Sequence, residues 1–196
     1  MRAPGAVRLL GGELRGRPVR VPPGARPSEG RVREALFSIW AERIPGARFL
    51  DLFAGSGAVA LEALSRGAAT AVAIDGAGPA IAAVRDNARA LGLASRCQVV
   101  RADLGHEVDR LAQRMGRFDL VFADPPYGFA EWAELLRLAE RLLDGAGALA
   151  LEHSRRADLP CGDGSLTMRD RRNYGESCLS FYGPAAGDAT EVRGPA

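Results

Sequence analysis

Short apolar runs alternate with longer amphipathic stretches through the middle of the chain. Five of these runs are four to six residues long and bounded by Gly, Pro or Asp, which is typical of buried strands in a parallel sheet. The stretches between them carry apolar residues at helical spacing. The expected strands are 48–53, 71–75, 97–101, 118–123 and 148–152, and the expected helices are 58–66, 79–91, 105–114 and 131–143. This order predicts a doubly wound α/β sheet with right-handed crossovers.

The pattern changes after residue 152. Two further strands, 166–170 and 177–182, follow each other with a short connection, which predicts an antiparallel hairpin. The expected sheet is therefore mostly parallel and seven-stranded, with an antiparallel C-terminal hairpin at its edge. Trp132 lies on the apolar side of the helix 131–143, so we expect it in the core.

The N-terminal part of the chain predicts a small extension. Residues 6–21 indicate a basic hairpin that turns at Gly11 and Gly12, and residues 28–43 an amphipathic helix with Ser28 as its N-cap. We therefore expect three parts: a hairpin and helix over 1–44, an α/β domain over 45–183, and a disordered Gly/Ala/Pro-rich tail over 184–196.

Positive charge is concentrated near the N-terminus. The whole chain carries a net charge of +2, yet its first 33 residues hold eight arginines against Glu13 and Glu29. A basic patch on a nearly neutral protein favours a polyanionic partner on one face, with a solvated surface segment as the alternative. All 26 basic residues are arginine, a bias that a GC-rich genome produces by itself.

Other compositional features narrow the class of protein. No apolar stretch approaches about 18 residues, and the N-terminus lacks the apolar segment of a signal peptide, so we expect a cytosolic protein without membrane contact. Three cysteines without CxxC spacing argue against a disulfide framework and against a zinc site. We expect no metal.

A glycine-rich loop follows the first expected strand, in FLDLFAGSGAVALEAL (49–64). Gly55 and Gly57 permit a tight turn and a close approach of the backbone to a ligand, and the next helix presents free N–H groups. Asp75, at the end of the second strand, is placed to accept both hydroxyls of a ribose. These features predict a nucleotide-type cofactor, and they fit dehydrogenases and methyltransferases equally.

Two more acids favour a cationic cofactor. Asp51 stands at the entrance of the glycine-rich loop, where it would repel a diphosphate but attract an amino group. S-adenosylmethionine is a cofactor of this kind. Asp103, after the third strand, is placed to accept from an adenine amine, and Leu104 to offer a backbone N–H. The alternative for each acid is a solvated carboxylate or a helix cap.

The sequence FADPPY (122–127) follows the fourth strand and has no evident use in hydride transfer. Asp124 and the carbonyl of Pro125 are acceptors for an exocyclic amine on a base, and two prolines fix the loop in advance. Tyr127 is expected to stack on the same base, a contact worth about 1–3 kcal/mol. The alternative is a rigid turn with no chemical role.

Together these motifs resemble the bacterial 16S ribosomal RNA guanine-N2 methyltransferase family over residues 7–182. The resemblance lies in RLLGGELRGR (8–17), RPSEGRVREALFSIW (26–40), LDLFAGSGAVALEALSRGA (50–68) and FADPPY. It implies a Rossmann-like class I methyltransferase that transfers a methyl group from S-adenosylmethionine to the N2 amine of a guanine in 16S ribosomal RNA, at the family's position 966. The implied partner is an assembled or assembling 30S subunit, and we expect a monomer.

The resemblance also assigns residues. Asp124, Pro125, Pro126 and Tyr127 match the catalytic loop, and the cofactor positions are Asp51, Phe53, Ala54, Gly55, Gly57, Asp75, Asp103 and Leu104. Bases inside a duplex cannot reach such a crevice, so the N-terminal arginines are expected to hold phosphates around a looped-out guanine. This predicted RNA-binding set is Arg8, Arg15, Arg17, Arg20, Arg26 and Arg33. For Arg26 and Arg33 the alternative is pairing with acids that fix the helix.

Three departures from the family pattern are visible. Ser28 replaces a common threonine, Asp75 replaces a longer glutamate, and the tail has no counterpart. Four other functions stay open: an adenine-N6 methyltransferase, a glutamine methyltransferase, a dehydrogenase and a non-catalytic RNA-binding assembly factor. The acid in DPPY argues against the glutamine methyltransferases, which carry Asn there.

Overall fold

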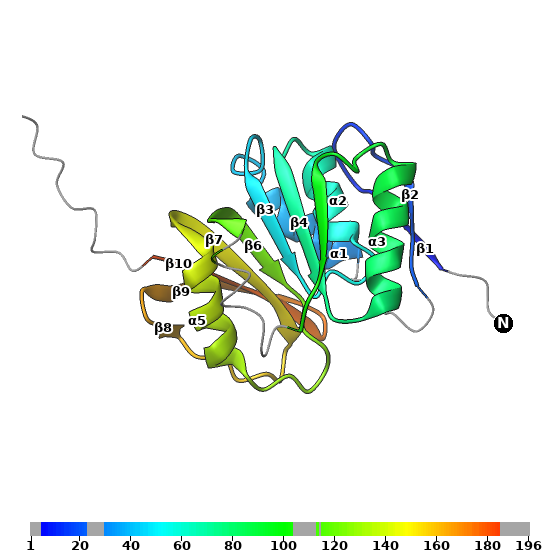
Figure 1. Ribbon diagram of the computed structural model, residues 1–196. Helices are drawn as coiled ribbons and strands as arrows, with labels where there is room; N and C mark the ends of the chain where they lie inside the picture. The colour runs from blue at the N-terminus through cyan, green and yellow to red at the C-terminus, as the bar shows by residue number, and fades with distance from the viewer. Residues whose placement is uncertain (1–4, 23–29, 104–112, 114, 185–196) are drawn as a thin grey trace, which may run out of the picture.

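The computed structural model describes residues 5–22, 30–103, 113 and 115–184 (Figure 1). Several predictions from the sequence lie outside these residues: Arg26, the Ser28 N-cap, Leu104, nearly all of the helix 105–114, and the tail after Pro184. Pro184 itself belongs to the last strand of the sheet. Among the helices of the described ranges, none is long and apolar enough to span a bilayer.

One eight-stranded sheet forms the centre of the protein, in the order β5-β4-β3-β6-β7-β10-β9-β8. The first five of these strands pair in parallel, and β10 runs antiparallel to both β7 and β9. This confirms the predicted fold class. The strands are β3 Arg48–Leu52, β4 Thr70–Asp75, β5 Cys97–Arg101, β6 Phe118–Ala123, β7 Leu143–Ser154, β8 Gly162–Asp163, β9 Leu166–Tyr174 and β10 Ser177–Pro184.

Some strand ends differ from the prediction. β9 continues to Tyr174 because exposed residues such as Arg172 still pair with β10, although their polarity hides the strand in the sequence. The turn that follows holds only Gly175 and Glu176, and Gly175 has the positive φ of 67° that such short hairpin turns require. β8 is a two-residue strand that adds an eighth member to the sheet.

Helices cover both faces of the sheet (Figure 1). One apolar cluster joins the sheet to α1 (Gly30–Ile39), α2 (Ala58–Ser65) and α3 (Gly78–Ala90), and the other joins it to α5 (Trp132–Leu142). The amphipathic pattern of α5 accounts for its position, since its buried residues include Trp132, Leu135 and Leu136. All residues of α2 are buried, so a second layer must cover the side of α2 that faces away from the sheet.

The N-terminal extension forms that second layer. β1 (Ala6–Arg8) and β2 (Pro18–Arg20) pair antiparallel as predicted. The chain bends at Gly11 and Gly12 as predicted, and the connection continues through the whole segment up to β2. A Cβ on Gly12 would lie 1.9 Å from the carbonyl oxygen of Ser65, so this glycine permits the connection to pack directly on the C-terminal end of α2.

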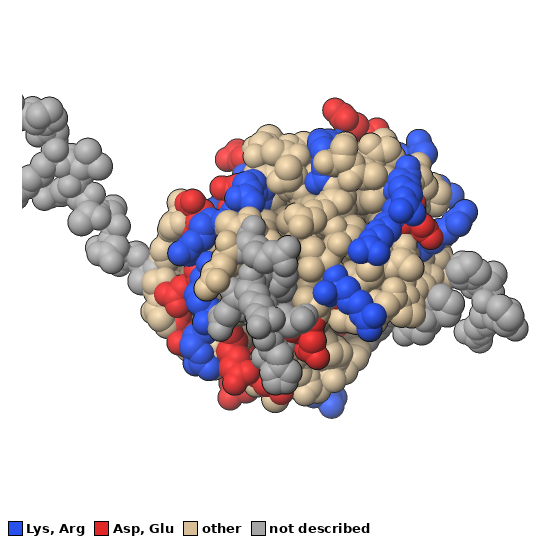
Figure 2. Space-filling model, viewed as in Figure 1, with Lys and Arg blue, Asp and Glu red and all other residues tan. Residues whose placement is uncertain are grey.

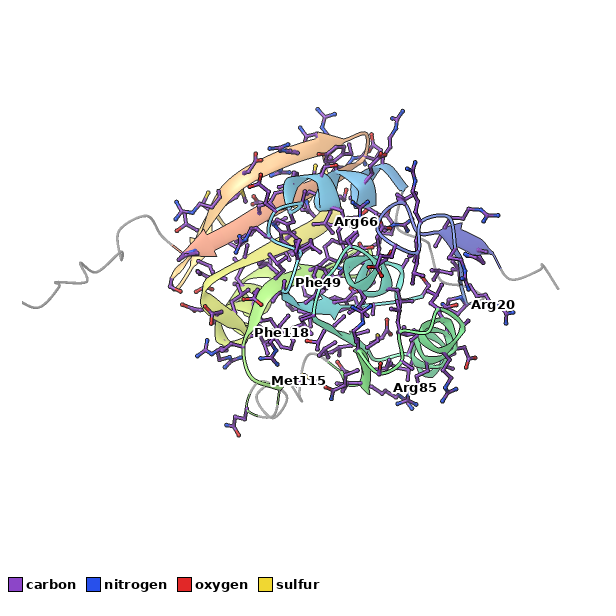
Figure 3. All side chains as sticks on the ribbon, turned by 90° about the horizontal axis from the view of Figure 1, so that it is seen from above. Arg20, Phe49, Arg66, Arg85, Met115 and Phe118 are labelled. Carbon is purple, nitrogen blue, oxygen red and sulfur yellow. The ribbon has the colours of Figure 1, made fainter. Side chains whose placement is uncertain are left out.

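Glu62 of α2 is the polar centre of this packing. Its carboxylate is fully buried and accepts hydrogen bonds from Arg33 Nε at 2.9 Å, Arg66 Nη2 at 2.8 Å and the backbone N–H of Leu10 at 3.2 Å. Arg66, labelled in Figure 3, also lies over the ring of Phe37 on α1, 4.8 Å from its centroid. One carboxylate therefore connects the hairpin, α1 and α2.

Asn87 of α3 makes a second polar connection. Its side-chain amide donates to the carbonyl of Arg20 and accepts from the N–H of Arg20, both at 2.9 Å, so it pairs with β2 as a neighbouring strand would. The same amide donates to the carbonyl of Ser56 at 3.0 Å. The hairpin is thereby joined to the glycine-rich loop.

Removing the Glu62 carboxylate should destabilise the protein strongly. Glu62→Ala leaves the guanidinium of Arg33 buried without its counter-ion, so we expect the free energy of unfolding to fall by about 3–5 kcal/mol. Asp86→Ala is the matched control, because Asp86 pairs with Arg89 while 68% of its side chain is exposed, and it should cost no more than about 1 kcal/mol. Urea denaturation measures both, and equal losses would contradict the role of Glu62.

Candidate active site

A cavity of about 820 Å³ opens at the C-terminal ends of the parallel strands, where open α/β sheets bind their ligands. Its volume lies within the usual range for small-molecule sites. Of the predicted cofactor residues, Asp51, Phe53, Ala54, Gly55 and Asp75 line it, together with the whole of Asp124 to Tyr127. Gly57 and Asp103 do not line it.

The register of the sheet explains why these side chains meet. Asp51 of β3 pairs with Ala73 of β4 and with Phe122 of β6, and Phe122 pairs with Ala150 of β7. Paired residues in parallel strands point to the same face, as do residues two positions apart. The acids that come two residues after these partners, Asp75, Asp124 and Glu152, therefore follow one another along one face of the sheet edge.

The glycine-rich loop has an unusual backbone. Gly55 and Gly57 have φ of 54° and 78°, and Phe53 has φ of 64°, a conformation that costs a residue with a side chain about 1–3 kcal/mol. A Cβ on Gly57 would lie 2.8 Å from Cγ1 of Val84 on α3. Gly57 is thus needed for close packing behind the cavity, which explains why the sequence motif contains it although it does not line the site.

Asp75 and Asp51 hold this loop and the start of α2. Asp75 accepts from the N–H of Gly55 at 2.9 Å and from the N–H of Ala77 at 2.8 Å, and Asp51 accepts from the N–H of Ala60 at 3.1 Å. A carboxylate has about four acceptor positions. Each acid therefore keeps acceptor capacity for a ligand in the cavity.

Negative charge is concentrated in this part of the cavity. Asp51 is 1% exposed, and its burial, opposed by the bond from Ala60 and reinforced by the nearby carboxylates of Asp124 and Asp75, raises its pKa well above the ordinary value of 3.8. A cation placed among these three acids would relieve their mutual repulsion. The site is therefore built for a positively charged ligand.

The DPPY segment turns back on itself. The N–H of Phe129 donates to the carbonyl of Pro126 at 3.1 Å, and Gly128 has φ of 82°, which together define a type II turn. Tyr127 lies at the corner of this turn and is 72% exposed, whereas Pro125 is buried. The loop thus has a fixed base and presents a flat ring at its tip.

The sequence did not predict a row of packed aromatic side chains that adjoins this loop. Four rings pack edge to face, each on the next. The ring centroids are 5.8 Å apart for Phe53 and Phe129, 4.9 Å for Phe129 and Trp132, and 6.0 Å for Trp132 and His153. Trp132 is buried as predicted, but it also lines the cavity. The row joins the glycine-rich loop, the DPPY loop and the end of β7, and helical periodicity alone gave no signal for it.

His153 is fixed as one neutral tautomer. Its Nδ1 lies 2.8 Å from the carbonyl oxygen of Ser154, so Nδ1 carries the hydrogen, and Nε2 then accepts from the hydroxyl of Ser180 at 2.8 Å. Burial, opposed in part by the Ser154 bond, lowers the pKa of His153. Within the described ranges, no three His, Cys, Asp or Glu side chains are arranged to hold a metal ion.

Other residues from the C-terminal strands complete the cavity. Glu152, Ser154, Arg156 and Asp158 follow one another at the end of β7, and Ser177 begins β10. The sequence offered one usable signal: the expected strand 148–152 ends at an acid, as the expected strand 71–75 does.

The predicted arginines fall into two groups. Arg8, Arg15, Arg17 and Arg20 are exposed on the hairpin, but Arg33 is 3% exposed and is bound to Glu62 and to the carbonyl of Arg8. Arg33 is therefore removed from the predicted RNA-binding set, because its guanidinium holds α1 to α2. Exposed Arg85 of α3 lies on the same side of the molecule as Arg20 (Figure 3), and basic side chains gather beside α3 and the hairpin (Figure 2).

Comparison with known proteins identifies the family to which the chain belongs. A family model described as "Conserved hypothetical protein 95" matches residues 7–183. The "Putative rRNA methyltransferase YlbH" of Bacillus subtilis is 34% identical over 180 residues, which are 90% of this chain and 98% of that protein. The "Ribosomal RNA small subunit methyltransferase D" of Escherichia coli K12 is 41% identical over 143 residues, which are 69% of this chain and 68% of that protein.

A solved structure gives the same result. The "Putative methyltransferase yhhF from Escherichia coli" superposes with a TM-score of 0.78 at 33% identity, over 92% of this chain and 98% of that chain. The sheet and its glycine-rich loop are those of a class I S-adenosylmethionine-dependent methyltransferase. The chain belongs to the "Conserved hypothetical protein 95" family, that of the small-subunit rRNA methyltransferase D proteins, which confirms the resemblance seen in its sequence.

The raised pKa of Asp51 predicts a pH-dependent stability. The folded protein holds the proton of the Asp51 carboxyl group more tightly than the unfolded chain does. Below pH 3.8 the group is protonated in both states, so it does not lower the free energy of unfolding. As the pH rises from there through the pKa of the folded state, the unfolded chain loses this proton more readily, and the free energy of unfolding falls. Asp51→Asn keeps an acceptor for Ala60 but does not ionise. Its free energy of unfolding should therefore rise relative to the original protein as the pH increases from about 4 towards neutral. Urea denaturation across this range measures the difference, and a constant difference would contradict the prediction.

Proposed function

We propose that the protein transfers a methyl group from S-adenosylmethionine to the exocyclic N2 amine of one guanine in 16S ribosomal RNA, during maturation of the small subunit in the cytoplasm. The observation that carries the proposal is the arrangement of Asp51, Asp75 and Asp124 on one face of a single cavity. Two of these acids suit a cationic nucleoside cofactor, and the third belongs to a rigid loop beside it.

The cofactor half of the cavity fits S-adenosylmethionine by its chemistry. Asp75, at the end of β4, would hold the ribose hydroxyls, and Asp51 would hold the amino group. Gly55 keeps the backbone free of side chains at the point of closest approach. When bound, the cofactor supplies an electrophilic methyl group on a positively charged sulfur, which the surrounding carboxylates favour.

The DPPY loop supplies the other half of the reaction. The lone pair of a base amine is delocalised into the ring, so the amine is a poor nucleophile until acceptors fix its hydrogens. The Asp124 carboxylate and the Pro125 carbonyl would do this without reorganisation, because the loop is already rigid. The methylated nitrogen becomes acidic only after the transfer, and Asp124 or water then takes the proton. Tyr127 would stack on the base.

The first experiment identifies the product. The protein is incubated with S-adenosylmethionine labelled in its methyl group and with unmodified small ribosomal subunits, alongside the RNA freed of protein, and the labelled nucleoside is identified after digestion. We expect label in N2-methylguanosine. Comparing the two substrates shows whether the assembled particle is required.

Two variants make this experiment decisive. Asp124→Ala should lower the rate by about 100-fold or more, since an oriented hydrogen-bond partner of the reacting group is typically worth that much. Asp86→Ala removes an exposed acid on α3 and should leave the rate unchanged. Label in adenosine or in protein would overturn the guanine assignment, and no label in any component would favour a non-catalytic role.

We further propose that the exposed arginines of the hairpin bind RNA phosphates. Arg15→Ala with Arg17→Ala should weaken RNA binding and reduce the slope of log K against log salt by about 1 to 2, since each phosphate contact contributes slightly less than one unit. Affinity for S-adenosylmethionine should not change. Arg137→Ala, on α5, is the control, because that exposed arginine pairs with Asp163. An unaltered salt slope in the double variant would refute the proposal.

A further inference from the structure

The atoms of a base edge determine which acceptors and donors can select it. Guanine presents, in order, the N2 amine, the N1–H group and the O6 carbonyl, so it offers two donors followed by an acceptor. Adenine presents an acceptor at N1 and a donor at N6, the opposite arrangement at the ring nitrogen. A site that accepts from N1–H and donates to O6 therefore binds guanine and repels adenine.

Glu152 occupies the position next to Asp124 in the sheet. Ala123, the last residue of β6, pairs with Leu151 of β7, so Asp124, directly after β6, and Glu152, within β7, stand side by side at the same level. Glu152 is 6% exposed and lines the cavity.

A pair of hydroxyl groups follows beyond Glu152, one at the end of β7 and one at the start of β10. Ser154, two residues after Glu152, pairs directly with Ser177 of β10, and both line the cavity. Directly opposed side chains of an antiparallel pair lie about 5 Å apart. Across β6, β7 and β10 the cavity thus presents the Asp124 carboxylate, the Glu152 carboxylate and then hydroxyl groups, which can donate.

We propose that Glu152 is the residue that selects guanine, by accepting the N1–H hydrogen bond while the Ser154–Ser177 pair donates to O6. The order of groups along the sheet edge matches the order N2, N1, O6 along the base, with Asp124 at the amine. This inference rests on the proposed guanine-N2 methylation and names the residues that direct it to guanine. Adenine would bring the lone pair of its N1 against a carboxylate.

A change of acid to amide should alter base preference. 2-Aminopurine keeps the N2 amine of guanine but has an acceptor at N1 and no O6. The original protein should methylate guanine in preference to 2-aminopurine at the target nucleotide. Glu152→Gln places an N–H donor where N1 of 2-aminopurine can use it, so the ratio of kcat/KM for guanine to that for 2-aminopurine should fall by about tenfold or more, the range of one base-edge contact.

The measurement uses small subunits reconstituted with RNA that carries either base at the nucleotide found in the labelling experiment. Because the ratio compares two substrates of one variant, a partial loss of folded protein does not affect it. Glu176→Gln is the matched control: Glu176 is exposed in the β9–β10 turn beside Ser177 and does not line the cavity, so the ratio should not change. An unchanged ratio in Glu152→Gln would overturn the inference.

A second measurement needs only the original protein, in case Glu152→Gln does not fold. Inosine keeps N1–H and O6 but lacks the N2 amine, so subunits carrying inosine at the target should compete with guanine-containing subunits. Subunits carrying 2-aminopurine should compete about tenfold less well or worse. Equal competition would overturn the role of Glu152. If guanine itself is not labelled, the proposed function fails, and the two failures are thereby distinguished.

Discussion

The parallel register of β4, β3, β6 and β7 is the constraint on which the site depends. It places the ends of these strands at one level, so that Asp75, Asp51, Asp124 and Glu152 share one face of one edge. Burying Asp51 raises its pKa, and the nearby carboxylates of Asp124 and Asp75 raise it further, so this arrangement is unfavourable in the free protein. The apolar clusters on both sides of the sheet supply the stability that tolerates this arrangement.

The N-terminal extension depends on a different kind of interaction. α2 is buried on all sides because the hairpin and α1 cover it, and burying a helix in this way requires that its polar groups find partners. The carboxylate of Glu62 pairs with Arg33 and Arg66. The hydroxyl of Ser65 accepts from the N–H of Leu14 and donates to the carbonyl of Gly11. The surface with the exposed arginines is therefore held firmly to the layer that forms the cofactor loop.

Periodicity predicted the fold because each core strand and helix is apolar where it is buried. It could not predict how far β9 extends, since Arg171 and Arg172 point to solvent while their backbone pairs. Sequence motifs predicted the acids and the DPPY loop, because each motif is a short run of consecutive residues. Arg33 was misassigned because its charge is visible in the sequence but its partner Glu62, 29 residues away, is not. The row from Phe53 to His153 depends on tertiary contacts between three separate segments of the chain.

The position of β10 has a consequence for how the protein is made. It follows every other strand of the sheet in the chain, yet it lies between β7 and β9, and its Phe181 packs against Trp40, the residue after α1. Contacts between segments so distant in sequence form late, since the loop between them must close first. During synthesis β7 therefore keeps an open edge, and α1 lacks part of its packing surface, until Ser177–Pro184 leaves the ribosome. The central sheet is thus complete only after its last strand in the chain has been made.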